Sequence, residues 1–332
     1  MGEQANYRPG TNPGPPWPTL VATTVCLWLR RGTRGTLFRR HRVAALTVLA
    51  ATALVAGGLA IALTRQAGAA PASGMEAAQG GVGPVARSPA AGMAATWVVR
   101  QVGRDAIVGC DPGMCRLLVA HGFPAGGLLA LGPGAPGLHL CDVIVATPAI
   151  GKLLGGRLER EDAPAVIAGF GSGRARIDIR AIAPRGAAAY RGALSADWAA
   201  RRKAAAQLVT SPRIHTGDAA RQELLTGKVD SRLLITLAAL AASYPVHVVG
   251  FGDAGPGAAA GMPLREMEIA GTGSPAYRAA ELQHIRSSVL AQHSVFLPTH
   301  VSLVRMAGGA ALRIEFGAPS PLGLLIGRPV TQ

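Results

Sequence analysis

The sequence predicts an α/β protein: a single N-terminal transmembrane helix, then a Rossmann-like three-layer α/β unit and a C-terminal α+β unit. Three observations lead to this fold class. One long uncharged apolar run lies near the amino terminus, strand and helix patterns alternate over residues 94–184, and two strands, a helix and two strands close the second unit. Alternation of strands and helices favours a mainly parallel sheet covered by helices. The order of two strands, a helix and two strands favours an antiparallel sheet.

The composition excludes two broad classes of protein. The chain has 332 residues, of which 49% are hydrophobic and only 4% aromatic, and its net charge is +15. This hydrophobic share is ordinary for globular domains, so neither a polytopic membrane bundle nor a chain disordered throughout fits. Only three of the 33 basic residues are lysine, and Ala, Gly and Pro are abundant, which is typical of a high-GC bacterial genome. Single Ala, Arg or Gly positions therefore carry little functional weight.

Residues 43–64 form the predicted transmembrane helix. Residues 43–63 are 21 uncharged positions, and at about 1.5 Å of rise per residue they span roughly 30 Å, the thickness of a hydrocarbon core. Seven arginines and one glutamate precede this run. The positive-inside rule therefore places residues 1–42 in the cytoplasm as a disordered basic tail, and everything after the span outside the cell membrane. This is a single-pass, signal-anchor topology.

A cleaved secretion signal is the alternative interpretation of the same segment. The triplet Ala67, Gly68 and Ala69 follows the apolar run and has the small-x-small form of a cleavage site. However, a signal peptide usually has an apolar core of about 7–15 residues within a total length of about 15–30 residues. Here the core is longer and follows 42 residues. We therefore expect the span to be retained.

Positive charge also continues beyond the span. Residues 65–93 lack hydrophobic periodicity and predict a flexible stalk. The net charge divides into +6 for residues 1–42 and +9 for residues 65–332. The outer excess favours membrane lipid, an anionic cell-wall polymer or envelope proteins as partners. Nucleic acid is not expected, because the basic residues are dispersed rather than clustered with aromatic ones.

The predicted extracytoplasmic α/β domain covers residues 94–184. It begins with a helix pattern over residues 94–102, and Asp111 with Pro112 predicts a capped helix that Gly122 ends. The predicted strands are residues 106–110, 128–131, 142–146, 165–170 and 176–182, with a helix over 149–158. A Gly-Ser-Gly run between the last two strands predicts a hairpin turn.

The predicted extracytoplasmic α+β domain covers residues 185–332. Its helix patterns lie over residues 186–209, 218–225, 231–243 and 274–292. Its strand patterns lie over residues 246–251, 264–270, 299–306 and 311–316. The third helix is strongly apolar, so we expect it to be buried. Arg201, Arg202 and Lys203 are expected on the solvent face of the first helix.

Residues 95–184 resemble a domain of a known enzyme family. The resemblance rests on WVVRQVGRDAIVGCDPGMCRLLVAHGFP (97–124), DVIVATPAI (142–150) and AVIAGFGSGRARIDIRAI (165–182). These runs are similar to the soluble extracytoplasmic tail domain of actinobacterial family 39-type glycosyltransferases, which use polyprenyl-phosphate sugars. The resemblance implies an accessory domain near cell-envelope glycans. The whole chain also resembles uncharacterised actinobacterial single-pass membrane proteins, some of them linked to contractile injection systems.

The resemblance transfers no catalytic residue to this chain. The family's acidic catalytic residue lies in loops between many membrane helices, whereas this sequence has one predicted span. Where the family carries paired acidic residues after the first strand, this chain has Cys110 and Asp111. Any role carried over to that pair is therefore in doubt.

Three of the four cysteines lie in the predicted exported part. Cys110 and Cys115 fall at the end of a predicted strand and in the first turn of the next helix, so a disulfide between them is geometrically feasible, and an oxidising exterior permits one. A bridge from either of them to Cys141 and buried free thiols are the alternatives. Neither metal nor cofactor is expected, because the spacing is not C-x-x-C, no histidine pair stands nearby and the Gly-rich runs lack a P-loop ending.

Three arginines form the best candidate binding surface in the sequence. Arg174, Arg176 and Arg180 are separated by even numbers of residues on the predicted hairpin, so they share one face of the strand. A solvated edge strand is the alternative, because charge on an edge also prevents aggregation.

No residue is assigned a catalytic role. Four carboxylates offer acid and base groups for glycan cleavage, but the sequence does not bring them together. They are Asp142, Asp178, Asp230 and Asp253.

The favoured hypothesis is a membrane-anchored envelope protein with a non-catalytic binding or scaffolding role. The second hypothesis is an envelope glycan hydrolase or transferase, with Asp178 or Asp253 as acid or base. The third is a membrane anchor for a cytoplasmic assembly such as a contractile injection system, which would act through residues 1–42.

Overall fold

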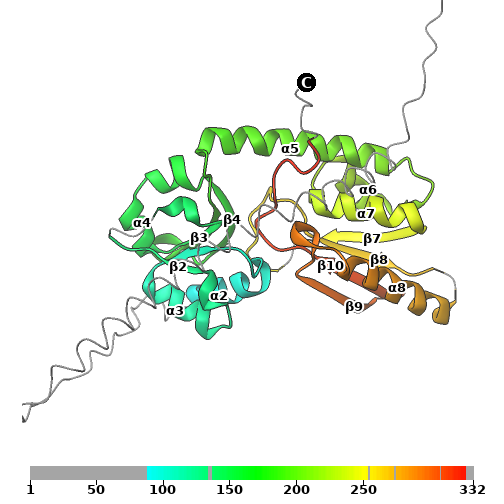
Figure 1. The fold of residues 1–332 in the computed structure, drawn as a ribbon, viewed down its shortest axis with the longest axis horizontal. Helices are drawn as coiled ribbons and strands as arrows, with labels where there is room; N and C mark the ends of the chain where they lie inside the picture. Colours follow the sequence, from blue (N-terminus) through cyan, green and yellow to red (C-terminus); the bar gives the residue numbers. More distant parts are fainter. Residues whose placement is uncertain (1–87, 134–136, 253–254, 273, 307, 327–332) are drawn as a thin grey trace, which may run out of the picture. The chain divides into compact units, whose positions relative to one another are not determined.

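The computed structural model shows a mixed α/β protein that contains two five-stranded sheets (Figure 1). The structure describes residues 88–133, 137–252, 255–272, 274–306 and 308–326. The predicted cytoplasmic tail, the predicted transmembrane helix and most of the predicted stalk therefore lie outside the described residues. Within the described residues, no helix combines the length and the apolar character needed to cross a bilayer.

The first sheet has the strand order β2-β1-β3-β5-β4. Its second strand, β1 (Val108–Cys110), lies parallel both to the edge strand β2 (Leu128–Ala130) and to the central strand β3 (Val143–Ala146). On the other side of β3 lies β5 (Ile177–Ala181), antiparallel both to β3 and to β4 (Ala165–Phe170). All five strands predicted within residues 94–184, which we call the first half, are confirmed, as is the hairpin between the last two.

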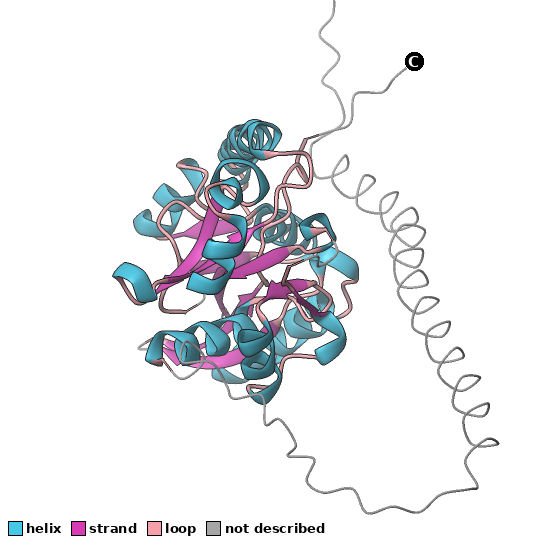
Figure 2. Ribbon diagram, turned by 90° about the vertical axis from the view of Figure 1, so that its left-hand side faces the viewer, coloured by secondary structure: helices cyan, strands magenta, loops and turns pink. Residues whose placement is uncertain are grey.

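Helices cover both faces of the first sheet (Figure 2). On one face lie α2 (Pro89–Gln101) and α3 (Pro112–Ala120). On the other lie α4 (Pro148–Leu154) and the π-helical turn Leu158–Asp162. Successive residues of β3 alternate between the two apolar cores, as the period of a strand requires. The first helix begins earlier than predicted because Ser88 caps it, its side chain accepting the N–H of the third helical residue.

The second sheet has the strand order β6-β7-β8-β10-β9. The pair β6 (Ile214–Thr216) and β7 (Val246–Gly252) is parallel. The remaining neighbours, β8 (Glu266–Ala270), β10 (Gly309–Glu315) and β9 (His300–Met306), pair antiparallel. The sequence did not predict β6, because three residues are too few to display an alternating pattern.

The helices predicted within residues 185–332, which we call the second half, are confirmed. They are α5 (Ala187–Leu208), α6 (Asp218–Leu225), α7 (Ser231–Ser243) and α8 (Pro275–Leu290). The apolar helix α7 is buried along most of its length, as predicted. It packs against α5 and β7, and α8 packs against β10 (Figure 1). Both Ala311 and its neighbour Leu312 are fully buried, so both faces of β10 are covered at the middle of the strand.

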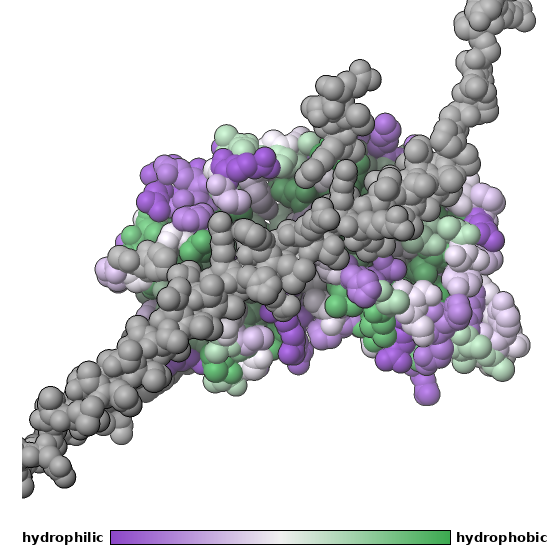
Figure 3. Space-filling model, in the orientation of Figure 1, coloured by the Kyte–Doolittle hydropathy of each residue, from purple (hydrophilic) through white to green (hydrophobic). Residues whose placement is uncertain are grey.

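Two segments of the second half bind the first half through backbone hydrogen bonds. The N–H of Ala318 donates to the carbonyl of Gln101 at 2.5 Å, just beyond the end of the second sheet. The N–H of Gly169, on the outer side of β4, donates to the carbonyl of Gly257 at 2.8 Å. On the surface drawn in Figure 3, hydrophilic and hydrophobic residues are interspersed over the described part that is in view.

Candidate functional site

Polar residues at the strand ends of the first sheet hold its loops. Asp111 follows β1, and its Oδ1 accepts the N–H groups of Gly113 at 2.9 Å and Met114 at 3.0 Å. Its other oxygen accepts the hydroxyl of Thr147 at 2.6 Å, at the end of β3. Asp142 lies before β3, at the opposite end of the parallel strands, where it accepts the N–H of Ile107 at 2.9 Å. The two carboxylates therefore do not share a site.

A disulfide joins the end of β1 to the first turn of α3. Cys110 and Cys115 are bonded, with their Cα atoms 5.4 Å apart. Cys141 is a buried free thiol in the apolar core on the other face of the sheet. Burial, and secondarily the charge of Asp142, raises the pKa of this thiol to about 11, so it stays protonated and unreactive at neutral pH.

The three hairpin arginines do not form one exposed basic surface. Arg180 is only 7% exposed, and its guanidinium donates to Glu159 at 2.9 Å and to Asp178 at 3.1 Å. The expectation differs from the structure because β5 is an internal strand, and the turn that contains Glu159 covers this end of it. Arg176 is exposed but also paired with Asp178, at 2.8 Å, while Arg174 lies in the exposed turn before β5.

The described candidate carboxylates are not brought together. Asp178 is held between two guanidiniums on β5, whereas Asp230 is fully buried at the start of α7. Burial raises the pKa of Asp230, but the charge and hydrogen bonds of Arg232 more than offset this, so the pKa lies below its usual value. Asp253 lies outside the described residues. In the part of the chain that the structure describes, no three His, Cys, Asp or Glu residues are placed to hold a metal ion.

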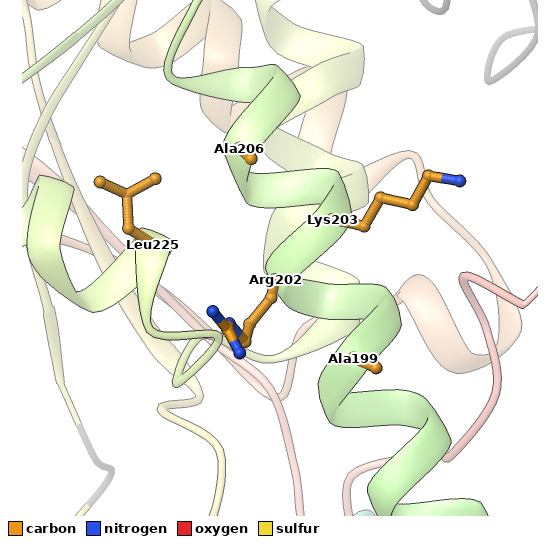
Figure 4. A pocket seen from close by; sticks show the side chains of 5 residues that line it. All are labelled: Ala199, Arg202, Lys203, Ala206 and Leu225. Carbon is orange, nitrogen blue, oxygen red and sulfur yellow. The ribbon is translucent and has the colours of Figure 1, made fainter.

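A hollow of about 510 Å³ lies along α5 beside the end of α6 (Figure 4). It is lined by Ala199, Arg202, Lys203, Ala206 and Leu225. Figure 4 shows Arg202 turned toward α6 and Lys203 extending from the other side of α5. These two cations and three apolar side chains line the hollow, which we call the α5–α6 groove.

The arginine of the α5–α6 groove is held in place by its neighbours. Its guanidinium lies 4.9 Å from the ring centre of Trp198, and the indole N–H of Trp198 donates to the carbonyl of Thr226 at 3.0 Å. Gly227 packs against the arginine stem with φ of +71°, and a Cβ there would lie 2.5 Å from Cγ of Arg202. Only glycine fits this turn without strain. The sequence offered no local signal for this contact between two helices.

Adjacent cations of α5 have opposite environments. Arg201, expected on the solvent face, is only 3% exposed and pairs with Asp197 at 2.9 Å. Its guanidinium also donates to the carbonyl of Gly227 at 2.6 Å. Within the described part of the chain, neither Arg202 nor Lys203 forms an ion pair with a carboxylate. These two exposed side chains are therefore available to an anion, whereas Arg201 is not.

Neither a protein-family model nor a curated protein nor a solved structure matches this chain. The resemblance of residues 95–184 to a glycosyltransferase tail domain therefore stays a prediction. The α5–α6 groove lies outside those residues and depends on its own geometry alone.

Proposed function

We propose that this chain is a single-pass membrane protein whose exported part is a non-catalytic binding or scaffolding domain at the cell envelope. The observation that carries the proposal is the disulfide between Cys110 and Cys115. Disulfides persist in oxidising compartments and are rare in the cytosol, where thiols are kept reduced. This agrees with the topology expected from residues 1–42 and 43–64, with the amino terminus in the cytoplasm and the described residues outside.

The finer fold class belongs to the same proposal. A crossover through α3 connects the parallel strands β1 and β2, and helices lie on both faces of that sheet, which supports a Rossmann-like three-layer unit. In the second sheet, four of the five strands pair antiparallel, which supports an α+β unit.

The α5–α6 groove is the surface through which the domain binds an anionic cell-wall polymer. A phosphate or carboxylate that reaches Arg202 gains charge-assisted hydrogen bonds without breaking an existing ion pair. Because Trp198 and Gly227 hold this arginine, little side-chain entropy is lost on binding. Lys203, which extends from the other side of α5, adds a second cation to the lining of the hollow.

The two other hypotheses have less support. A glycan hydrolase needs a pair of carboxylates across one cleft, whereas Asp178 is held by two arginines and Asp230 is buried and ion-paired. An anchor for a cytoplasmic assembly would depend on residues 1–42, which lie outside the described residues. Membrane lipid stays a predicted partner of the span and of its basic flank.

Thiol labelling of the full chain in bacterial membranes tests the topology. Without reductant, Cys110 and Cys115 should not react with a maleimide polymer, and after reduction and unfolding both should. Protease added to intact spheroplasts should remove the described residues from the cell surface. A protected carboxyl-terminal part with both thiols reduced would place the domain in the cytoplasm and overturn the proposal.

Binding of inorganic polyphosphate to the purified full chain tests the groove. Replacing Arg202 and Lys203 with glutamine should weaken binding about tenfold or more, or about 1.4 kcal/mol. The matched control replaces Arg185 and Arg191, which are exposed near the start of the same helix, and removes the same charge. Equal losses in both double variants would mean that net charge, not the groove, binds the polymer. Vesicles of phosphatidylglycerol and phosphatidylcholine in a parallel titration separate lipid binding from polymer binding.

A further inference from the structure

Three of the four edge strands in the two sheets are protected. The edges β2 and β6 are three residues long, too short to recruit another strand. The outer side of β4 is covered by backbone of the second half, where Gly169 donates to Gly257 and Ala259 donates to Ile167, each at 2.8 Å. Short and covered edges are the usual ways in which a monomeric sheet avoids association.

The fourth edge, β9, has neither protection. It is seven residues long and pairs with β10 at every position without a bulge. No described strand pairs with its outer side. Its sequence is HVSLVRM, with no proline and with Arg305 as the only residue that carries a full charge at neutral pH. A long, regular and largely apolar edge is a template for pairing with another chain.

An apolar side chain marks the core face of this edge. Leu303 lies opposite Leu312, and Leu312 lies opposite Ile269 on the next strand. Directly opposite residues share one face of a sheet. Leu312 and Ile269 are fully buried, whereas Leu303 is 47% exposed. The apolar core face of the second sheet therefore continues to its rim, where one more strand would cover Leu303.

We propose that β9 pairs antiparallel with β9 of a second copy of this chain, which joins two five-stranded sheets into one of ten strands. The register is centred on Leu303, so that this residue meets its own counterpart on the two-fold axis. Ser302 then lies opposite Val304 of the second copy, and Val301 lies opposite Arg305. This inference goes beyond the proposed function, because it holds whatever the α5–α6 groove binds.

The charge pattern of β9 favours a second copy in this register. The centred antiparallel pairing places Arg305 opposite Val301, so no two like charges oppose each other. A parallel pairing would set Arg305 against Arg305, and like charges directly opposite are destabilising. Because the antiparallel pairing has two-fold symmetry and uses up both edges, assembly stops at a dimer.

Single-cysteine cross-linking in membranes that contain the full chain tests the register. Each variant is made in a Cys26→Ser background, and Cys141 stays in place because it is buried. Under mild oxidation, Leu303→Cys should form a disulfide-linked dimer in good yield. Ser302→Cys alone should give little dimer, whereas the pair Ser302→Cys and Val304→Cys should give much. Cross-linking of Ser302→Cys without cross-linking of Leu303→Cys would overturn the proposed register.

The oligomeric state of the detergent-solubilised full chain tests the interface itself. Leu303→Lys should raise the dimer dissociation constant at least tenfold, because two ammonium groups would meet on the axis. Leu290→Lys, on α8 and 46% exposed, is the matched control and should leave the dimer intact. Circular dichroism checks that both variants fold, and if Leu303→Lys unfolds, Leu303→Ser replaces it. A wild-type monomer at micromolar concentration, or a dimer unchanged by the substitution at position 303, would overturn the proposal.

Discussion

The two halves of the described structure both have apolar cores but differ in the cross-links and buried charges that supplement them. The first sheet is held by two apolar cores and by the disulfide between Cys110 and Cys115. Among the described residues, five of the six buried charged side chains belong to the second half, and only Arg180 belongs to the first. The buried charges lie where the second half contains irregular backbone whose polar groups need hydrogen-bond partners.

In the second half, the buried charged side chains bind an irregular segment that is not part of either sheet. Residues 316–323 leave β10 and run between the halves. Asp230 accepts the hydroxyl of Ser320 at 2.6 Å, Asp197 accepts the N–H of Gly323 at 2.9 Å, and Arg232 donates to the carbonyl of Gly317 at 2.9 Å. Buried backbone groups need partners, and apolar side chains supply none. The buried charged side chains therefore supply the hydrogen bonds that a neighbouring strand would otherwise supply.

The largest expected effect comes from breaking one of these pairs. Asp230→Ala leaves Arg232 buried without its carboxylate, which costs about 3–5 kcal/mol of unfolding free energy. Urea unfolding of the full chain measures the change. Asp218→Ala, at an exposed position in the first turn of α6, is the control and should change the stability by less than about 0.5 kcal/mol. A loss below about 1 kcal/mol for Asp230→Ala would contradict the role given to the buried pairs.

A smaller effect is expected from removing the cross-link of the first half. Replacing Cys110 and Cys115 with serine opens a short loop, so the expected loss is about 2 kcal/mol. Dithiothreitol should destabilise the wild type by a similar amount and leave the double variant unchanged. If the reductant lowers both equally, then the disulfide is not what stabilises this half.

A somewhat smaller effect again is expected at the α5–α6 groove. Gly227→Ala forces a side chain into a left-handed backbone and onto the stem of Arg202, which costs about 1–2 kcal/mol. The substitution should also weaken polyphosphate binding, because the arginine loses its fixed position. Gly192→Ala, in the open part of α5, is the matched control and should stabilise the helix by about 0.5–1 kcal/mol. Equal signs for the two variants would contradict the packing described for Gly227.

The sequence predicted what local patterns determine. Asp111 caps α3 and α7 is buried, because a capping residue and a long apolar period act within one element. The sequence did not predict which polar face of a helix or strand is covered by another element. Arg180 is buried because β5 is internal to its sheet, and Arg201 is buried because the α6–α7 connection packs on it. For Arg201, the four-residue spacing from Asp197 was a signal for an inward ion pair.

The candidate site was beyond sequence reasoning for the same reason. Arg202 and Lys203 were recognised as exposed, but the hollow beside them depends on a turn at Gly227, some two dozen residues further along the chain. The hairpin arginines followed the period of a strand, but the order of strands in the sheet decides whether that face meets water. Such facts reside in tertiary contacts.

The smallest expected effect is a pH dependence of stability that arises in the second half alone. The rings of His215 and His247 stack across β6 and β7 with centroids 4.5 Å apart. Burial and the charge of His215 lower the pKa of His247, and Glu281 offsets part of this. The unfolded chain therefore binds this proton more readily, so stability should fall as pH drops from about 6.5 through the lowered pKa.

Nuclear magnetic resonance titration of the histidine ring protons measures this effect directly. In His215→Gln, the pKa of His247 should rise toward its usual value, because the neighbouring positive charge is gone. The loss of stability between pH 7 and pH 5 should shrink with it. His293→Gln, at an exposed histidine that follows α8, is the control and should leave the titration of His247 unchanged. If His215→Gln leaves the pKa of His247 unchanged, the charge of His215 is not a cause of the lowered pKa.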